Sequence, residues 1–176
     1  MKYREAKNTD VEQLATIHAN SWRSTYRGLF SDEFLNNEVF ENRRSVWNER
    51  LNKPSNNQLV LVAEENNKIT GFICAYGNDD AQYGSLIDNL HIKRSNKRNG
   101  IGTELMIKAG EWLQSRYPEN GVYLWVMEEN NPARVFYEKL GAINAGLVDK
   151  PNPVGGGSAM NCRYIWSDPT VLVNNG

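Results

Sequence analysis

Residues 90–103 read LHIKRSNKRNGIGT and contain the transition that decides the fold. An apolar strand pattern ends here, a basic turn with two glycines follows, and an amphipathic helix is predicted over 100–117. The first amides of such a helix have no partner within it, and the helix dipole adds positive potential. Gly100 and Gly102 carry no Cβ atom that would hold a phosphate away from those amides. The stretch therefore predicts an anion site, with a pyrophosphate as the best candidate ligand.

Local charge supports this reading of the turn. Residues 93–98 contain four cations and no acid, whereas the whole chain has a formal net charge of -1. A Walker loop is excluded because Thr103 and Glu104 stand where Lys and Ser or Thr would follow the last glycine. The dinucleotide fingerprint fails because Leu105 occupies its third glycine position. The alternative to an anion site is an ordinary strand–helix turn with solvated charges.

The segments on either side of the turn predict an α/β fold. Strands are expected over 3–6, 59–63, 69–76, 85–92, 121–127, 143–148 and 161–166. Helices are expected from residue 9 to the turn at Gly28, again from residue 31, and over 40–51, 100–117 and 131–140. Strands 85–92 and 121–127 flank a helix, which requires a right-handed parallel crossover. The prediction is a mixed, mostly antiparallel sheet with a central parallel β-α-β unit and flanking helices.

Length and composition bound the remaining possibilities. The 176 residues favour a single domain over 1–166, followed by a tail over 167–176 that gives no strong signal. The balance of 20 Lys+Arg against 21 Asp+Glu argues against nucleic-acid and membrane-surface partners. Two cysteines without C-x-x-C spacing and two histidines predict neither a disulfide framework nor a metal site. With no membrane-length apolar stretch and no signal-peptide core, we expect a cytoplasmic protein.

A second motif follows the β-α-β unit directly, where residues 130–141 read NNPARVFYEKLG. Together with the turn, it resembles the signature of the GCN5-related N-acetyltransferase (GNAT) family. The first family motif, (Gln/Arg)-x-x-Gly-x-(Gly/Ala), is matched by residues 97–102 with Lys97 in the first position. The second, N-x-x-A-x-x-F-Y-x-x-x-G, is matched by Asn130, Ala133, Phe136, Tyr137 and Gly141. The departure at Lys97 weakens the match only slightly, since such a turn binds mainly through backbone amides.

The resemblance implies a GNAT fold, acetyl-CoA as co-substrate, and direct acetyl transfer to a primary amine without a covalent enzyme intermediate. It also implies that the backbone of 90–92 pairs with the pantetheine arm and that the amides of 98–103 hold the pyrophosphate. Asn130 is expected to meet the pantetheine or the thioester. The full set of expected cofactor-binding residues is Leu90, His91, Ile92, Lys97, Arg98, Asn99, Gly100, Ile101, Gly102, Thr103, Asn130, Ala133 and Phe136.

The resemblance places Tyr137 at the position of the general acid. A phenol of pKa near ~10 can protonate a departing thiolate of pKa near ~8.5. The alternative role for Tyr137 is a core aromatic beside Phe136. Helical residues that are adjacent in sequence point about 100° apart, so these two aromatic side chains need not share one role.

The acceptor ammonium must lose a proton before it attacks, because its pKa is near ~10.4. Asp88, Glu128 and His91 are candidate acceptors of that proton, directly or through water. Strict strand alternation puts Asp88 on the face of Leu86 and Leu90, within a largely apolar strand. Glu128 follows a strand end, where functional loops are common. For each acid the alternative is a solvated or structurally paired carboxylate.

Aromatic side chains are the candidates for the acceptor cleft. Trp22, Tyr26 and Phe30 follow the i, i+4 spacing of a core stripe, but Gly28 interrupts the helix and favours a lid formed by the last two. Trp125 either lines the cleft or packs in the core. The glycines of 155–157 either close over the acceptor or only connect two strands.

The leading functional prediction is acetylation of a small-molecule amine, such as a polyamine, an amino-acid derivative or an amine-bearing antibiotic. One alternative is acetylation of a protein N-terminus or lysine, which requires an open groove. The other is a non-catalytic acyl-CoA sensor, which has no need of a thiolate acid such as Tyr137. The resemblance also admits a homodimer, for which the sequence specifies no interface.

Overall fold

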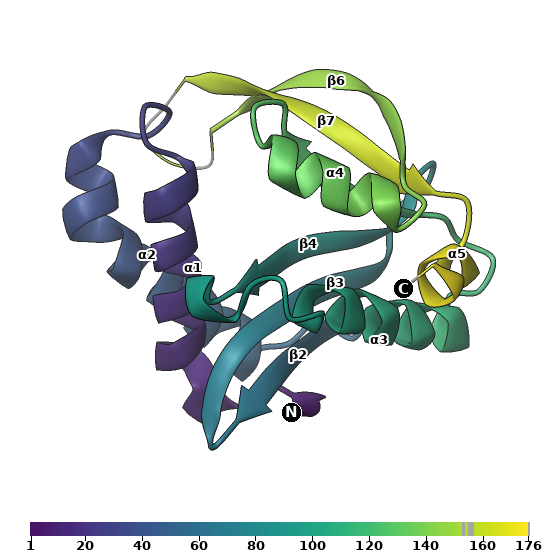
Figure 1. The fold of residues 1–176 in the computed structure, drawn as a ribbon, viewed down its shortest axis with the longest axis horizontal. Helices are drawn as coiled ribbons and strands as arrows, with labels where there is room; N and C mark the ends of the chain where they lie inside the picture. The colour runs from purple at the N-terminus through teal and green to yellow at the C-terminus, as the bar shows by residue number, and fades with distance from the viewer. Residues whose placement is uncertain (153, 155–156, 176) are drawn as a thin grey trace.

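The computed structural model describes residues 1–152, 154 and 157–175. Its strands form one seven-stranded sheet in the order β1-β2-β3-β4-β5-β7-β6, with helices on both faces (Figure 1). The strands are β1 Lys2–Glu5, β2 Gln58–Glu65, β3 Lys68–Asp80, β4 Gly84–Ile92, β5 Val122–Met127, β6 Ile143–Pro151 and β7 Ser158–Trp166. The helices are η1 Asn8–Asp10, α1 Val11–Thr25, η2 Phe34–Glu38, α2 Val39–Asn52, η3 Arg94–Asn96, α3 Ile101–Arg116, α4 Asn131–Lys139 and α5 Pro169–Asn174.

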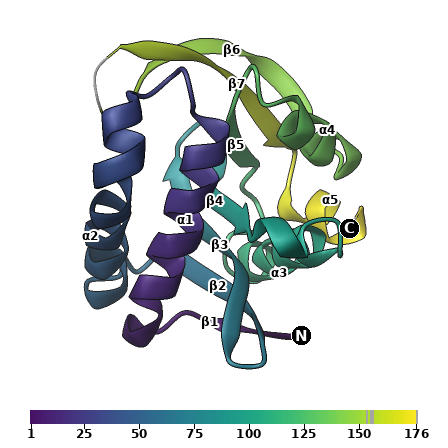
Figure 2. The same ribbon diagram turned by 60° about the vertical axis from the view of Figure 1, so that its left-hand side comes forward.

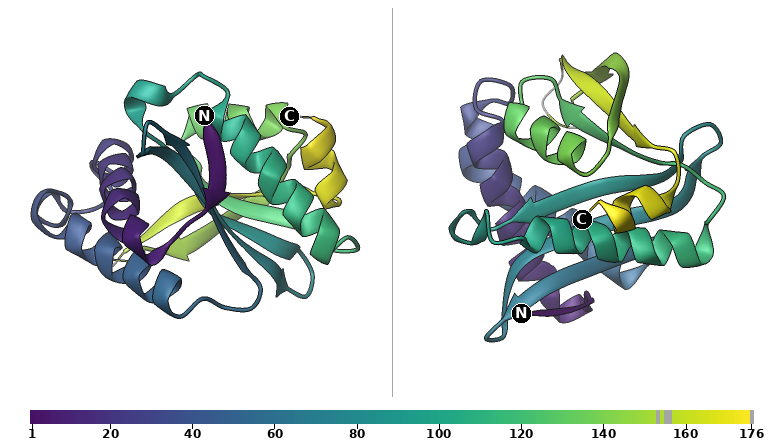
Figure 3. Two further views of the ribbon diagram at one scale, coloured as in Figure 1. Left: turned by 90° about the horizontal axis from the view of Figure 1, so that it is seen from below. Right: turned by 45° about the vertical axis from the view of Figure 1, so that its right-hand side comes forward.

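All neighbouring strands pair antiparallel except β4 and β5, which are parallel. The predicted mixed sheet with one parallel β-α-β unit is therefore confirmed. Figures 2 and 3 show α1 and α2 on one face of β2–β4 and α3 on the other. Among the described residues, no helix is long and apolar enough to cross a lipid bilayer.

Alternation along β3 explains this layering. Phe72 packs with Leu14 of α1 and Trp47 of α2, whereas its neighbour Ile73 packs with Leu105 of α3. Successive strand side chains point to opposite faces, so one strand supplies both cores. The centre of the sheet is therefore apolar on both faces.

The tail after β7 forms the helix α5, although its sequence contains no strong helical pattern. In α5 the Asp168 side chain accepts the Thr170 amide, and Pro169 occupies the first turn. Leu172 of this helix is fully buried against the core that includes α3. Gly110 permits this approach, because a Cβ atom there would lie 3.0 Å from Leu172 Cβ. The helix is visible beside α3 in Figure 3.

The parallel strands β4 and β5 pair only at their first residues. Their partners are Ser85 with Val122 and Leu86 with Tyr123, and beyond these pairs the strands diverge. At the joined end Gly84 has φ +84°, and a Cβ atom there would lie 2.2 Å from the Gly121 carbonyl oxygen. Only glycine at position 84 allows the two backbones to come this close, so the place where β4 and β5 meet depends on this residue. The divergence leaves main-chain groups of both strands without sheet partners on the facing edges.

Candidate active site

A cavity of about 890 Å³ lies where β4 and β5 diverge. Its volume falls within the range of small-molecule sites. Of the predicted site residues, those that line it are Leu90, His91, Ile92, Lys97, Arg98, Gly100, Ile101, Gly102, Thr103, Asn130, Ala133, Phe136, Tyr137, Asp88, Trp22, Tyr26 and Trp125. The two sequence motifs, over 97–102 and 130–141, thus both contribute residues to the cavity between the diverging strands.

The glycine turn has the geometry of an anion cradle. Arg98 and Gly100 both have left-handed backbones, with φ +67° and +76°. The first helical hydrogen bond runs from the Glu104 amide to the Gly100 carbonyl, so the amides of 101–103 lack acceptors within α3. A Cβ atom at Gly100 would meet nothing within 4 Å. Open space in front of free amides at a helix start is what a phosphate requires.

The β4 edge continues the cavity from this turn. Leu90 and Ile92 pack on the core shared with α3, while His91 lies against α1, with Nδ1 2.9 Å from Ser21 Oγ. The β3 side of the strand is fully paired through Gly71↔Ile92, Phe72↔His91 and Ile73↔Leu90. The opposite edge has no strand partner past Leu86, so it can accept an extended ligand as an added strand.

Tyr137 faces the cavity from α4. Its ring packs against Phe136, Tyr164 and Trp166 at centroid distances of 5.2, 6.4 and 6.2 Å. Within the described part of the chain, its hydroxyl makes no hydrogen bond, whereas the Tyr164 hydroxyl donates to Glu138. Burial raises the pKa of Tyr137, so the phenol keeps its proton at neutral pH. The arrangement fixes the ring and leaves its O–H free to donate.

Asp88 does not lie where strict alternation predicts. The β3–β4 register shifts between Cys74 and Ala75, which pair with Asn89 and Ile87 and leave Asp88 bulged. Its carboxylate therefore turns toward α2 and accepts a hydrogen bond from Arg50 Nη1 at 2.7 Å. Asp88 is exposed rather than set among apolar residues, and it lines the acceptor side of the cavity.

Two histidine rings contact each other at the wall formed by α1. The His18 and His91 ring centroids are 4.4 Å apart, and Trp47 Nε1 donates to His18 Nδ1 at 3.1 Å. Burial lowers the pKa of His18 well below its usual value and that of His91 to about 3, with nearby cations adding to both effects. Both imidazoles are therefore neutral at physiological pH, and His91 is a poor proton acceptor there.

The sequence model of the acetyltransferase (GNAT) family matches residues 15–142, which include the glycine turn and the second motif. This chain belongs to the GNAT family. The family prediction is confirmed, and with it the assignment of the chain as an acyltransferase that uses acetyl-CoA. The free amides of the turn and the open strand edge fit that co-substrate.

Known proteins similar to this GNAT enzyme include two bacterial relatives. YuaI of Bacillus subtilis, named an uncharacterized N-acetyltransferase, is 26% identical over 138 residues, covering 77% of this chain and 76% of the relative. Rv2775 of Mycobacterium tuberculosis, named a probable N-acetyltransferase, is 29% identical over 143 residues, covering 79% and 78%. Both matches span the larger part of each chain, as expected of relatives that share a whole fold.

Solved structures show the same fold. PaiA N-acetyltransferase of Thermoplasma acidophilum, in complex with coenzyme A, has a TM-score of 0.68 at 22% identity, covering 94% of this chain and 98% of that one. PH1933 of Pyrococcus horikoshii has a TM-score of 0.69 at 25% identity, covering 93% and 96%. The GNAT fold prediction is confirmed by these likenesses over nearly the full length.

Three predicted site residues lie outside the cavity lining of this GNAT enzyme. Phe30 is 6% exposed and stacks behind Trp22 at 5.3 Å, so it supports the aromatic wall instead of forming a lid. The Glu128 main chain pairs with Met160 and Arg134, beyond the end of β5. Asn99 sits in the turn without lining the cavity. The glycine loop was predicted over 155–157, and residues 155 and 156 lie outside the described residues.

Sequence reasoning missed the inner face of α2. Arg43, Trp47 and Arg50 follow i, i+4, i+7 spacing, and both arginines line the cavity. Trp47 lies between them in the sequence, is fully buried and donates a hydrogen bond to His18. The spacing is present in the sequence, but arginine side chains are mostly solvent-exposed, so their spacing alone does not indicate a cavity wall. A helical stripe that alternates Arg with Trp is the signal that could have identified this wall.

The depressed histidine pKa values predict a pH-dependent stability. The unfolded chain binds a proton at His91 below pH ~6.5, whereas the folded chain does not until pH falls to about 3. Stability therefore declines as pH falls through this window, by up to about 1.4 kcal/mol per pH unit for each such group. Urea unfolding near pH 7 and near pH 5 should show a smaller decline for His91→Gln than for the parent. Equal declines in the two proteins would contradict the buried, neutral state of His91.

Proposed function

We propose that this enzyme transfers the acetyl group of acetyl-CoA directly to the primary amine of a small molecule. The observation that carries the proposal is the cavity itself. It joins a free anion cradle at Gly100, an open strand edge and an unpaired phenol at Tyr137 to an aromatic wall formed by Trp22 and Tyr26. The cavity therefore has one end suited to a phosphate and another suited to an acceptor. The open strand edge connects the two ends.

The residues of this chain take separable roles in the proposal. The amides of 101–103 bind the pyrophosphate, and the free edge of β4 pairs with the pantetheine arm. Asn130, whose Oδ1 accepts the Ala133 amide at the start of α4, keeps its side-chain NH₂ for the ligand. Acetyl-CoA, when bound, supplies a thioester whose carbonyl carbon is open to attack by an amine.

Proton movements follow from the geometry. Tyr137 gives its proton to the sulfur as the C–S bond breaks, and its raised pKa keeps that proton available until then. Asp88 attracts the acceptor ammonium and takes up the proton that it loses, through water, before the C–N bond forms. We favour Asp88 because it lines the cavity, whereas Glu128 does not and His91 is too weakly basic.

A small acceptor fits the enclosure better than a peptide does. The end of the β6–β7 hairpin reaches the helical wall, where Val154 packs with the cluster that contains Trp22, Phe30 and Phe34. This contact connects the end of the hairpin to the helical wall at the acceptor end of the cavity. A protein acceptor would need an open groove at this position.

A thiol-release screen tests the proposal. The protein with acetyl-CoA should release CoA in the presence of small primary amines and should ignore peptides that present an N-terminus or a lysine. Isothermal calorimetry with CoA alone, run in parallel, measures the co-substrate site without an acceptor. Turnover of peptides but not of small amines would transfer the proposal to the protein-acetylating alternative. CoA binding without turnover of either class would favour the sensor.

We also propose a cytoplasmic location and retain the homodimer as a prediction. Cys74 and Cys162 are both free and buried, which fits a reducing compartment. The outer edge of the sheet is β6, where Ile143 and Leu147 are exposed, and two copies would meet most readily there. Cell fractionation and analytical ultracentrifugation measure these two properties.

A further inference from the structure

The acceptor end of the cavity carries an excess of positive charge. Arg43 and Arg50 line it from α2, and Asp88 lines it from β4. Arg50 and Asp88 form an ion pair at 2.7 Å. This leaves Arg43 as a lining cation that has no carboxylate partner among the described residues.

Arg43 is held in place although it has no ionic partner. Its guanidinium carbon lies 4.1 Å from the centroid of the Trp22 ring, and its Nε donates to Asn42 Oδ1 at 3.0 Å. Burial and the neighbouring Arg50 lower the pKa of Arg43 to about 10, while Asp88 opposes the shift. The guanidinium is still charged at neutral pH. A partly desolvated, ordered cation without a counter-ion favours an anionic ligand.

A second group of cations contacts the ring of Trp125. Trp125 lines the cavity, and its ring is contacted by Lys150 at 3.9 Å and by Arg163 at 4.4 Å. The Nε of Arg163 is buried and has no hydrogen-bond partner among the described residues. Arg163 contributes to lowering the pKa of Asp80, and Asp88 opposes the lowering of the pKa of Lys150.

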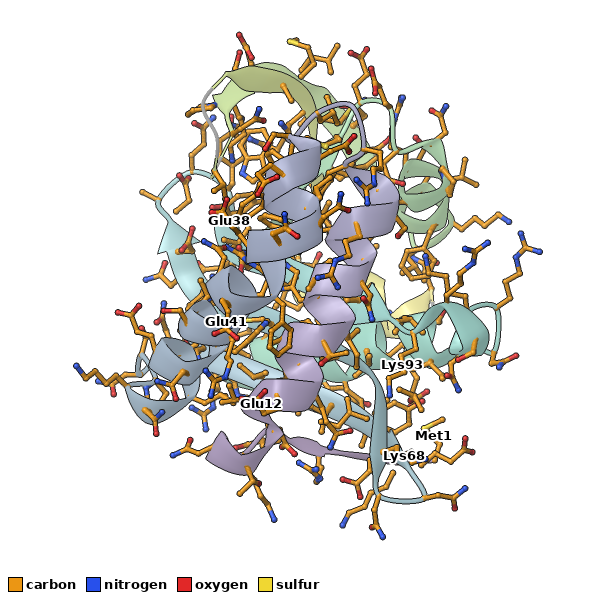
Figure 4. All side chains as sticks on the ribbon, turned by 90° about the vertical axis from the view of Figure 1, so that its left-hand side faces the viewer. Met1, Glu12, Glu38, Glu41, Lys68 and Lys93 are labelled. Atoms are coloured by element: carbon orange, nitrogen blue, oxygen red, sulfur yellow. The ribbon has the colours of Figure 1, made fainter. Side chains whose placement is uncertain are left out.

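Acids of the helical wall do not offset this excess. Glu12 of α1, Glu38 of η2 and Glu41 of α2 lie on the outer surface of this wall (Figure 4). Glu12 and Glu41 bind Arg44 there. Asp88 is thus the single carboxylate among the described residues that line the cavity, and it faces two lining arginines.

From this geometry we infer that the acceptor carries a carboxylate or another anionic group beside its amine, with Arg43 as the residue that binds the anion and Asp88 as the one that attracts the ammonium. The inference rests on the proposed function and narrows it to one substrate class. Amino acids and their derivatives present this pair of charges. Polyamines, one of the acceptors predicted above, would place further cations against Arg43 and Lys150.

Matched acceptors test the inference. L-phenylalanine, L-leucine and L-glutamate are compared with the amines that lack their α-carboxylate, and spermidine is added as a polycation. We expect kcat/KM to be at least about tenfold higher for the carboxylated member of each pair. We expect the same difference in the affinity of the amine for the CoA-saturated protein. Arg43→Gln should lower both quantities about 10- to 100-fold for the carboxylated amines and leave the others within about threefold.

Arg44→Gln is the matched control. Arg44 neighbours Arg43 on α2 but pairs with Glu12 and Glu41 on the outer surface, so its loss should change neither quantity. Arg43→Lys keeps the charge without the planar fork and should retain part of the preference. Circular dichroism of each variant shows whether the fold is intact.

The two proposals fail differently. The protein could acetylate spermidine or the decarboxylated amines in preference to the carboxylated ones, and Arg43→Gln could leave this preference unchanged. That result would overturn the inference and leave the proposed function standing. Turnover of peptides alone would overturn the proposed function. If no amine is acetylated, calorimetry still decides the inference, because absent or equal binding of the carboxylated amines to the CoA-saturated protein contradicts it.

Discussion

Tyr137→Phe should lower kcat by about 10²–10⁴-fold while the KM for acetyl-CoA stays within about threefold. The substitution removes only the hydroxyl, and the ring keeps its contacts with Phe136 and Trp166. A group that acts in the transition state without binding the ground state changes kcat and not KM. Steady-state thiol release, with intact fold verified by circular dichroism, measures both constants.

Tyr164→Phe is the control for this experiment. Tyr164 lies 6.4 Å from Tyr137 between ring centroids, but its hydroxyl bonds Glu138 and Arg134 and it does not line the cavity. We expect Tyr164→Phe to retain the parental kcat. Parental activity in Tyr137→Phe would return this residue to the role of a packed core aromatic.

Gly100→Val should weaken CoA binding by about 100-fold or more. The backbone at Gly100 has φ +76°, a region that β-branched residues strongly avoid. The added side chain would also enter the open space beside Gly100, where the proposed function places the phosphate. Each charge-assisted hydrogen bond that the amides of 101–103 lose costs about 1.5–3 kcal/mol. Isothermal calorimetry with CoA measures the change.

Gly28→Val separates this effect from backbone strain. Gly28 has φ +83° and likewise has nothing within 4 Å of its Cβ position, but it lies in the turn after α1 and does not line the cavity. Its substitution should cost a similar amount of stability and leave CoA affinity unchanged. An unchanged affinity in folded Gly100→Val would refute the phosphate-binding turn.

Local sequence signals were sufficient for most of the fold and for the turn to which the proposed function assigns the pyrophosphate. The helix α3 was predictable because its apolar spacing begins directly after Gly100, a residue that the left-handed cap requires. Asn130 and Pro132 mark the start of α4 in the same way, through a side-chain cap and a fixed φ. Anion binding by free amides depends on these same short-range features.

The acceptor half was harder to predict because long-range contacts decide it. The bulge at Asp88 arises from pairing with β3, and its partner Arg50 lies 38 residues earlier in the chain. The interruption at Gly28 favoured a lid that includes Phe30, but stacking on Trp22 turns this ring into the core. Such contacts leave no periodic signal, since they join segments whose patterns are read separately.

Product stoichiometry tests the central claim most directly. The protein is mixed with acetyl-CoA and L-phenylalanine or another amine that the screen identifies, and mass spectrometry quantifies free CoA, the N-acetylated amine and the intact protein. Direct transfer predicts equal amounts of CoA and N-acetylated amine, with the protein mass unchanged at every time point. Release of CoA without an acetylated amine, or accumulation of acetylated protein ahead of the product, would contradict it.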